Sequence, residues 1–240
     1  EMGGGGGILS LSQREDQSRA RPSTAQGCID VTNTLHRQGT VEELKKDYVI
    51  FTTKAKGINR KGSGAKIREF LRICQKYDPV NTGSSKKGNI FKDDINIDEL
   101  ISSLGDGATS AAVFTSLDSL KNVIAELIEA DLGISINVSG LLDEVQECCR
   151  TRGKDRHSVE QSLGFWGAKD RLPERDVLTI NTLCGHGLVS FNFIRKMIDY
   201  IKMRRLTPAE AAKIMGKSCE CAVFNTARAE DLLKKMLLDP

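Results

Sequence analysis

The sequence predicts an α/β fold, a mixed sheet with alternating strands and packing helices, preceded by a flexible N-terminal tail. Short apolar or β-branched segments alternate with amphipathic segments of about 10 to 15 residues, as in layered α/β domains. The chain has 240 residues, of which 39% are hydrophobic and 28% charged, a composition typical of globular proteins. No apolar run reaches the roughly 18 residues that a transmembrane helix needs, so we expect no membrane span.

The N-terminal 26 residues differ in composition from the rest of the chain. They contain five consecutive glycines and few apolar side chains, so they bury too little apolar surface to offset the entropy of ordering. The apolar stretch ILSL is too short for a secretory signal. We therefore divide the chain into a disordered tail (1–26), an N-terminal segment with a basic glycine loop (27–82) and a main α/β domain (83–240).

In the first half of the chain, the types of residue and their spacing predict helices and a strand. A short helix over 41–47 is followed by a strand over 48–53, where β-branched and aromatic residues dominate. Ile67, Phe70 and Leu71 recur at helical spacing, which predicts a helix over 63–77. Turn-forming residues over 78–89 indicate a long loop or an internal boundary.

The second half repeats the alternation of strands and helices. Residues 154–175 contain glycines, a proline and the single tryptophan, and we interpret them as an excursion over the sheet. Thr207, Pro208 and Glu210 form a capping box that starts a helix, and Asn225 caps the last one. The predicted strands are 111–116, 134–140, 176–183 and 221–224, and the predicted helices are 117–133, 141–153, 188–203, 207–216 and 225–238.

The stretch TLCGHGLVSFN, residues 182–192, contains the strongest chemical signal. It places Cys184 and His186 two residues apart, with His186 between Gly185 and Gly187, and Cys219 and Cys221 repeat that spacing further along the chain. Four soft ligands in two close pairs can complete a tetrahedral zinc site or hold an iron–sulfur cluster. The pairs meet only if the strand that carries Cys221 lies antiparallel to the strand that leads into Cys184.

Other uses of these residues stay open. A thiol near a helix N-terminus is favoured as a thiolate, so Cys184 could be a nucleophile and His186 its base. His186 could equally be a structural histidine at a glycine turn. Cys148, Cys149 or His157 could join the site, and an extra thiolate would favour a cluster over zinc.

The second signal is a basic glycine loop over residues 54–68. It contains six Lys or Arg residues, three glycines and no acidic residue. Backbone N–H groups near Gly62 and Gly64 could cradle a phosphate while Lys61 or Lys66 supplies positive charge. The loop matches neither the P-loop nor the dinucleotide-binding motif, and charge runs are often only solvated surface.

These observations predict a cytoplasmic metal-binding α/β enzyme, with iron–sulfur or zinc as cofactor, that acts on a small anionic ligand. Seven cysteines without a secretory signal indicate a reducing compartment. The alternatives are a metal-free thiol enzyme that uses Cys184 and His186, and a non-catalytic basic module that binds nucleic acid or an acidic partner. A net charge of +3 gives nucleic acid little support. The reaction and the oligomeric state are left open.

Overall fold

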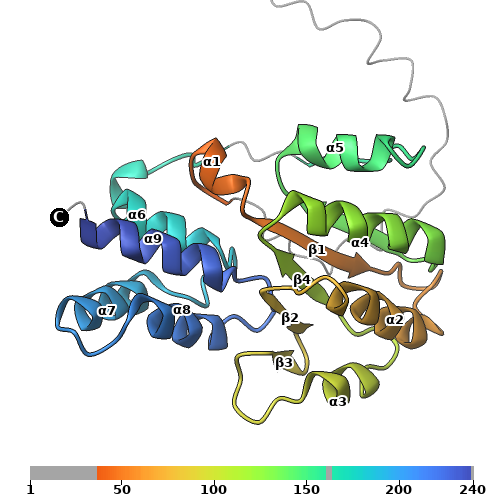
Figure 1. Cartoon of the computed structure of the whole chain (residues 1–240), viewed down its shortest axis with the longest axis horizontal. Helices are drawn as coiled ribbons and strands as arrows, with labels where there is room; N and C mark the ends of the chain where they lie inside the picture. Colours follow the sequence, from red (N-terminus) through yellow and green to blue (C-terminus); the bar gives the residue numbers. More distant parts are fainter. Residues whose placement is uncertain (1–36, 161–163, 239–240) are drawn as a thin grey trace, which may run out of the picture.

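The computed structural model describes residues 37–160 and 164–238, and it confirms the α/β class. Its five-stranded sheet has the order β3-β2-β4-β1-β5, and each neighbouring pair is antiparallel (Figure 1). The strands are β1 (Tyr48–Thr53), β2 (Asn81–Ser84), β3 (Gly88–Asn89), β4 (Ala111–Phe114) and β5 (Ser135–Ser139). The sheet thus takes strands from both of the segments, 27–82 and 83–240, that the sequence distinguishes. The predicted disorder of residues 1–26 concerns a part of the chain outside the described residues.

Helices cover both faces of the sheet. In Figure 1 the later helices, α6 to α9, gather on the left of the molecule, whereas α2 to α5 lie toward the right. The first layer consists of α2 (Ser63–Gln75), α3 (Ile97–Ser102), α4 (Leu117–Ala130) and α5 (Leu142–Arg150). The second consists of α6 (Arg175–Thr182), α7 (Phe191–Lys202), α8 (Pro208–Lys217) and α9 (Thr226–Leu238). The short helix α1 (Val41–Leu44) precedes β1, and a 3₁₀ turn spans Lys169–Arg171.

The strands supply one hydrophobic core on each face. Val49 and Val113 pack with helices α6 to α9, whereas Tyr48, Ile50 and Phe114 pack with α2 to α5. Side chains alternate between the two faces of a strand, so one run of apolar residues serves both cores. Within the part of the chain that the structure describes, no helix is both long and apolar enough to cross a membrane.

Two predicted strands are wrong. Residues 176–183 lie in α6 and its C-terminal cap, and residues 221–224 form an irregular link between α8 and α9. Val177, Ile180 and Leu183 are all buried and recur every third residue, which is a helical spacing. A short run with β-branched residues therefore packs as a helix against the sheet.

The structure of residues 78–89 also differs from the long loop or internal boundary that the sequence predicts. It contains β2 and β3 rather than a long loop, and the side chains of β2 are all buried. These residues are polar or glycine, which conceals a strand from a hydrophobicity pattern. Pairing with β4 at Asn81↔Val113 and Gly83↔Ala111 makes the segment a strand.

A buried carboxylate fixes the start of β1 to the last helix. Asp47 accepts hydrogen bonds from Arg37 at 2.7 and 2.9 Å and from Arg228 at 2.5 Å. Asn225 donates to the same carboxylate at 3.0 Å, and its side-chain oxygen accepts from the backbone N–H of Arg228, as expected of the predicted helix cap. Arg37 also donates to the carbonyl of Val223, so this cluster holds the link between α8 and α9.

Candidate functional site

Two loops bring together the Cys and His residues that the sequence singles out. Cys184 and His186 lie between α6 and α7, and Cys219 and Cys221 lie between α8 and α9. Cys221 Sγ is 2.8 Å from His186 Nδ1. The thiols of Cys184, Cys219 and Cys221 form hydrogen bonds with one another. All four side chains therefore meet in one cluster, which we call the Cys/His cluster.

The first loop is folded back by its own backbone and by Asn181. Cys184 N–H donates to the carbonyl of Asn181, whose side chain in turn donates to the carbonyl of Val189 at 2.7 Å. Gly185 and Gly187 have φ of 77° and 74°, a left-handed conformation that glycine adopts at little cost. The two glycines therefore allow the chain to turn on each side of His186.

The second loop is anchored by a side chain from the sheet. Asn89 donates to the carbonyls of Gly216, at 3.0 Å, and Cys219, at 2.6 Å. Asn89 is fully buried, so both bonds lie in the interior. Ala222 has φ of 60°, unusual for a residue with a side chain, and it turns the backbone directly after Cys221.

The cluster runs from the interior to the surface. Cys184 and Cys219 are fully buried, Cys221 is partly buried and His186 is exposed. Hydrogen bonds from Cys219 and Cys221, joined by the backbone N–H groups of His186 and Val189, lower the pKa of Cys184 to about 2. The hydrogen bond with Cys184, together with burial, raises the pKa of Cys219 to about 11, and hydrogen bonds with Cys184 and Cys219 raise the pKa of Cys221. These hydrogen bonds therefore favour the thiolate form at Cys184 over the thiolate forms at Cys219 and Cys221.

The route by which the pairs meet differs from the prediction. Cys184 follows the C-terminal end of α6, whereas we expected it at the end of a strand, and no antiparallel strand pair joins the two loops. The thiol is also not at a helix N-terminus, so a helix dipole does not favour its thiolate. His186 contacts Cys221 rather than Cys184, which changes the acid–base pair that the sequence suggests.

The donor set is that of a Cys₃His zinc site, but the groups are closely packed. Metal–ligand bonds of about 2.0 to 2.3 Å place tetrahedral ligand atoms roughly 3.6 Å apart. The 2.8 Å contact between Cys221 and His186 is shorter than this. Over residues 37–160 and 164–238, no group of three or more His, Cys, Asp or Glu side chains already has the geometry to hold a metal ion. An ion would require the exposed His186 to move outward by a fraction of an ångström.

The other cysteines of the described residues lie elsewhere. Cys148 belongs to the core beneath α2 to α5, whereas Cys184 and Cys219 belong to the core on the opposite face of the sheet. Burial raises the pKa of both Cys148 and Cys149. His157 forms its side-chain contact with the neighbouring Ser158. The contacts of these three residues therefore do not extend the Cys/His cluster.

The glycine amides of the basic loop bind a carboxylate of the protein itself. Gly62 N–H donates to Asp106 at 2.8 Å and Gly64 N–H at 2.7 Å, and these bonds lower the pKa of Asp106. Asp106 therefore fills the position at the N-terminus of α2 where we expected an anionic ligand. Lys61 is exposed and Lys66 is half-buried with its ammonium near Gly133.

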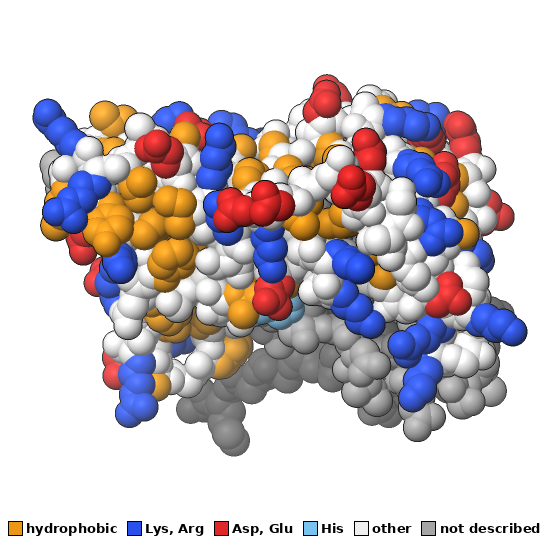
Figure 2. Space-filling view, turned by 90° about the horizontal axis from the view of Figure 1, so that it is seen from below, with side chains coloured by type: hydrophobic (Ala, Val, Ile, Leu, Met, Phe, Trp, Pro, Cys, Tyr) orange, Lys and Arg blue, Asp and Glu red, His pale blue; other side chains and the backbone are white. Residues whose placement is uncertain are grey.

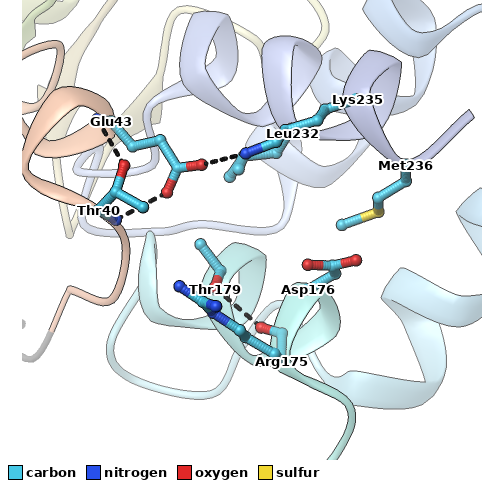
Figure 3. A pocket seen from close by; sticks show the side chains of 8 residues that line it. All are labelled: Thr40, Glu43, Arg175, Asp176, Thr179, Leu232, Lys235 and Met236. Carbon is cyan, nitrogen blue, oxygen red and sulfur yellow. Dashed lines mark hydrogen bonds and ion pairs between the residues drawn. The ribbon is translucent and has the colours of Figure 1, made fainter. Parts of the chain in front are cut away.

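Sequence reasoning did not indicate a small hollow between α1, α6 and α9 (Figure 3). Its volume is about 200 Å³, below the range of roughly 300 to 1,000 Å³ that is usual for ligand pockets. Glu43 points into it but is already engaged by Lys235 at 3.1 Å and by Thr40 N–H at 2.9 Å. The lining residues are Thr40, Glu43, Arg175, Asp176, Thr179, Leu232, Lys235 and Met236. None of them belongs to the predicted sites.

Comparisons with known proteins leave the Cys/His cluster as the basis for a functional assignment. No protein-family model, no curated protein and no solved structure matches this chain.

Proposed function

We propose that this protein binds a single zinc ion through Cys184, His186, Cys219 and Cys221. The observation that carries the proposal is the convergence of three thiols and one imidazole from two separate loops. A divalent cation would replace the thiol protons and allow all three sulfurs to be thiolates, which is the form that binds zinc. The N–H groups directed at Cys184 are the kind of outer hydrogen bonds that support metal thiolates.

Single zinc fits the geometry better than an iron–sulfur cluster. The three sulfurs lie within hydrogen-bonding contact of one another, and His186 Nδ1 lies 2.8 Å from Cys221 Sγ. A four-iron cluster keeps its thiolates much further apart, because its iron and sulfide ions must fit between them. One tetrahedral ion needs only a small opening of the cluster.

The ion would serve first as a structural link. Four protein ligands leave no open coordination position, and three thiolates make zinc a weak Lewis acid, so the site resembles closed structural sites. It would join the α6–α7 loop to the α8–α9 loop and so stabilise the helical layer. The reducing cytoplasm that we expect from the cysteine content would keep these thiols available.

Metal analysis of the full-length chain, purified under reducing conditions without chelator, tests the proposal. We expect about one zinc per chain and a colourless protein. Replacing Cys219 by Ser should remove the zinc and lower the thermal stability, because binding energy at such a site is also folding energy. Cys149→Ser, in the opposite layer, is the matched control and should keep the metal. Metal-free wild-type protein, or equal zinc in the Cys219→Ser variant, would contradict the assignment.

Substitution by cobalt gives a second readout that does not depend on stability. Tetrahedral cobalt bound to thiolates absorbs visible light through d–d transitions and in the near ultraviolet through sulfur-to-metal charge transfer. The charge-transfer intensity should fall in Cys221→Ser and stay unchanged in His186→Ala, whereas the d–d bands should change in both. Unchanged bands in either variant would remove that residue from the ligand set.

A metal-free thiol enzyme is the second candidate, and the contact between Cys221 and His186 favours it. Cys221 is the partly exposed thiol with an imidazole beside it, whereas the Cys184 thiolate is buried away from substrates. Alkylation by iodoacetamide separates the two functions. Zinc ligation predicts that Cys221 is protected until a chelator is added. Fast labelling of metal-free wild-type protein, slowed by His186→Ala, would support the thiol enzyme instead.

A further inference from the structure

A second group of residues, on the opposite side of the sheet from the Cys/His cluster, carries positive charge with no counter-ion among residues 37–160 and 164–238. Lys54 follows the end of β1, Arg60 lies in the basic loop and Lys86 lies in the turn between β2 and β3. Among the described residues, none of these three cations takes part in a salt bridge. We call them the Lys54 cluster. Figure 2, which views the molecule from below, shows many Lys and Arg side chains, with some Asp and Glu side chains among them, over the right half of the molecule.

The ammonium of Lys54 is in an unfavourable environment. Its side chain is partly buried, and its nitrogen donates to the carbonyl of Ala108. Burial, followed by the positive charges of Arg60 and Lys86, lowers the pKa of Lys54 to about 8. The Arg60 guanidinium lies beside Gly107, next in the chain to the Ala108 carbonyl that Lys54 contacts. Two further cations near a half-buried amine disfavour its charged form, and a bound anion would offset that repulsion.

Asp106, the acidic residue that most closely precedes β4 in the chain, does not supply that anion. The carboxylate of Asp106 is engaged by the amides of Gly62 and Gly64, and the charges that lower its pKa are those of Arg68 and Lys61. The balancing charge for the Lys54 cluster is therefore missing from the described contacts.

A row of buried hydroxyl groups lies on the same face of the sheet. Thr52 and Ser110 are 2.8 Å apart through their hydroxyl oxygens. The register Gly83↔Ala111 places Ser84 opposite Ser110, and side-chain alternation puts Ser84 on the face that Thr52 and Lys54 share. Ser84 is fully buried, and its hydroxyl has no hydrogen-bond partner. Such unsatisfied groups are rare inside proteins and call for an explanation. Ser84 is two positions before Lys86 in the chain, at the same end of the sheet as Lys54, so a ligand held by these cations is one explanation.

We propose that Lys54, Arg60 and Lys86 bind the phosphate group of a small phosphorylated molecule, with the Ser84 hydroxyl as a further hydrogen-bond donor. A guanidinium and two ammonium groups match the charge and the oxygen acceptors of phosphate. The half-buried position of Lys54 and the net charge of +3 favour a small ligand over a nucleic acid, which requires an extended basic surface.

Thermal denaturation in inorganic phosphate, against sodium chloride at equal ionic strength, tests the site. The melting temperature of the full chain should rise with phosphate and reach saturation, because phosphate binds only the folded state. Lys86→Met changes an exposed turn residue and should weaken phosphate binding by tenfold or more without unfolding the protein. Lys202→Met, at the end of α7, is the matched control and should keep the wild-type affinity.

Three results would overturn the proposal. The first is an absent or non-saturable shift in the wild-type protein, and the second is the same shift in the double variant Lys54→Met, Lys86→Met. The third is salt-sensitive binding of a DNA duplex oligonucleotide while phosphate has no effect, which would assign the cluster to nucleic acid. Zinc content is unaffected by any of these outcomes, so this test is independent of the metal proposal.

Sulfate provides a test of Lys54 itself, since sulfate keeps its charge between about pH 7 and 9. Its affinity for the wild-type chain should fall as the pH rises through 8, where Lys54 loses its proton. The Lys54→Met variant should bind more weakly and show a flatter pH profile. Parallel profiles for the two proteins would exclude Lys54 from the site.

Discussion

Replacing Asp47 by Asn should be among the most damaging single changes of a polar residue in this protein. The Asp47 side chain is fully buried, and the guanidinium groups of Arg37 and Arg228 on either side of it have exposed fractions of 4% and 2%. Asparagine retains the shape but removes the charge, so two arginines would stay in the interior without an anion. Removal of one partner from a buried ion pair costs about 3 to 5 kcal/mol. That range corresponds to a decrease of roughly 140- to 3,700-fold in the folding equilibrium constant, at about 1.4 kcal/mol for each factor of ten.

Urea denaturation followed by far-ultraviolet circular dichroism measures this loss. The midpoint should fall with little change in the dependence on urea, since the surface exposed on unfolding is similar. Asp231→Asn is the matched control, because Asp231 forms an exposed pair with Lys46 at 3.5 Å, and such pairs contribute about 0 to 1 kcal/mol. A loss below about 1 kcal/mol in Asp47→Asn would refute the reasoning, because it would mean that solvent reaches the arginines.

Three further predictions concern single residues. The pKa of Lys54 is about 8 in the folded chain, whereas the ordinary pKa of a lysine is 10.5; the unfolded chain therefore binds more protons between these values, and stability should rise with pH across that window. This rise should be smaller in Lys54→Met when both proteins are denatured by urea at pH 7, 8.5 and 10; equal rises would contradict the shift. Thr207→Ala removes the side-chain cap of α8 and should cost about 1 kcal/mol in the same urea assay, whereas Thr207→Ser should cost less. Asn89→Ala should lower stability by about 1 to 3 kcal/mol, because it leaves the buried carbonyls of Gly216 and Cys219 without this donor; it should also weaken zinc retention, measured by competition with a chelator.

Local sequence patterns were sufficient to predict the class of the fold and many of its helix signals. The capping box of Thr207 and Glu210 and the cap at Asn225 are present, because caps depend on residues three positions apart. The amphipathic patterns of α2 and α4 also predicted their buried faces, since helical periodicity is a local property. The Cys and His residues are soft metal ligands by residue type alone, and their binding of a metal stays a prediction.

Whether distant residues meet, and through which elements, depended on tertiary packing. Residues 176–183 contain an apolar pattern that is compatible with a strand or a helix, and packing against the sheet selects the helix. His186 and Cys221 are 35 positions apart, and they meet because the helices between them return the chain to the same place. Asp106 occupies the Gly62 amide from 44 positions away, a contact that no local motif encodes. The sequence specifies which groups are available, whereas burial and long-range packing determine which of them meet, because contact energies depend on distance in space rather than along the chain.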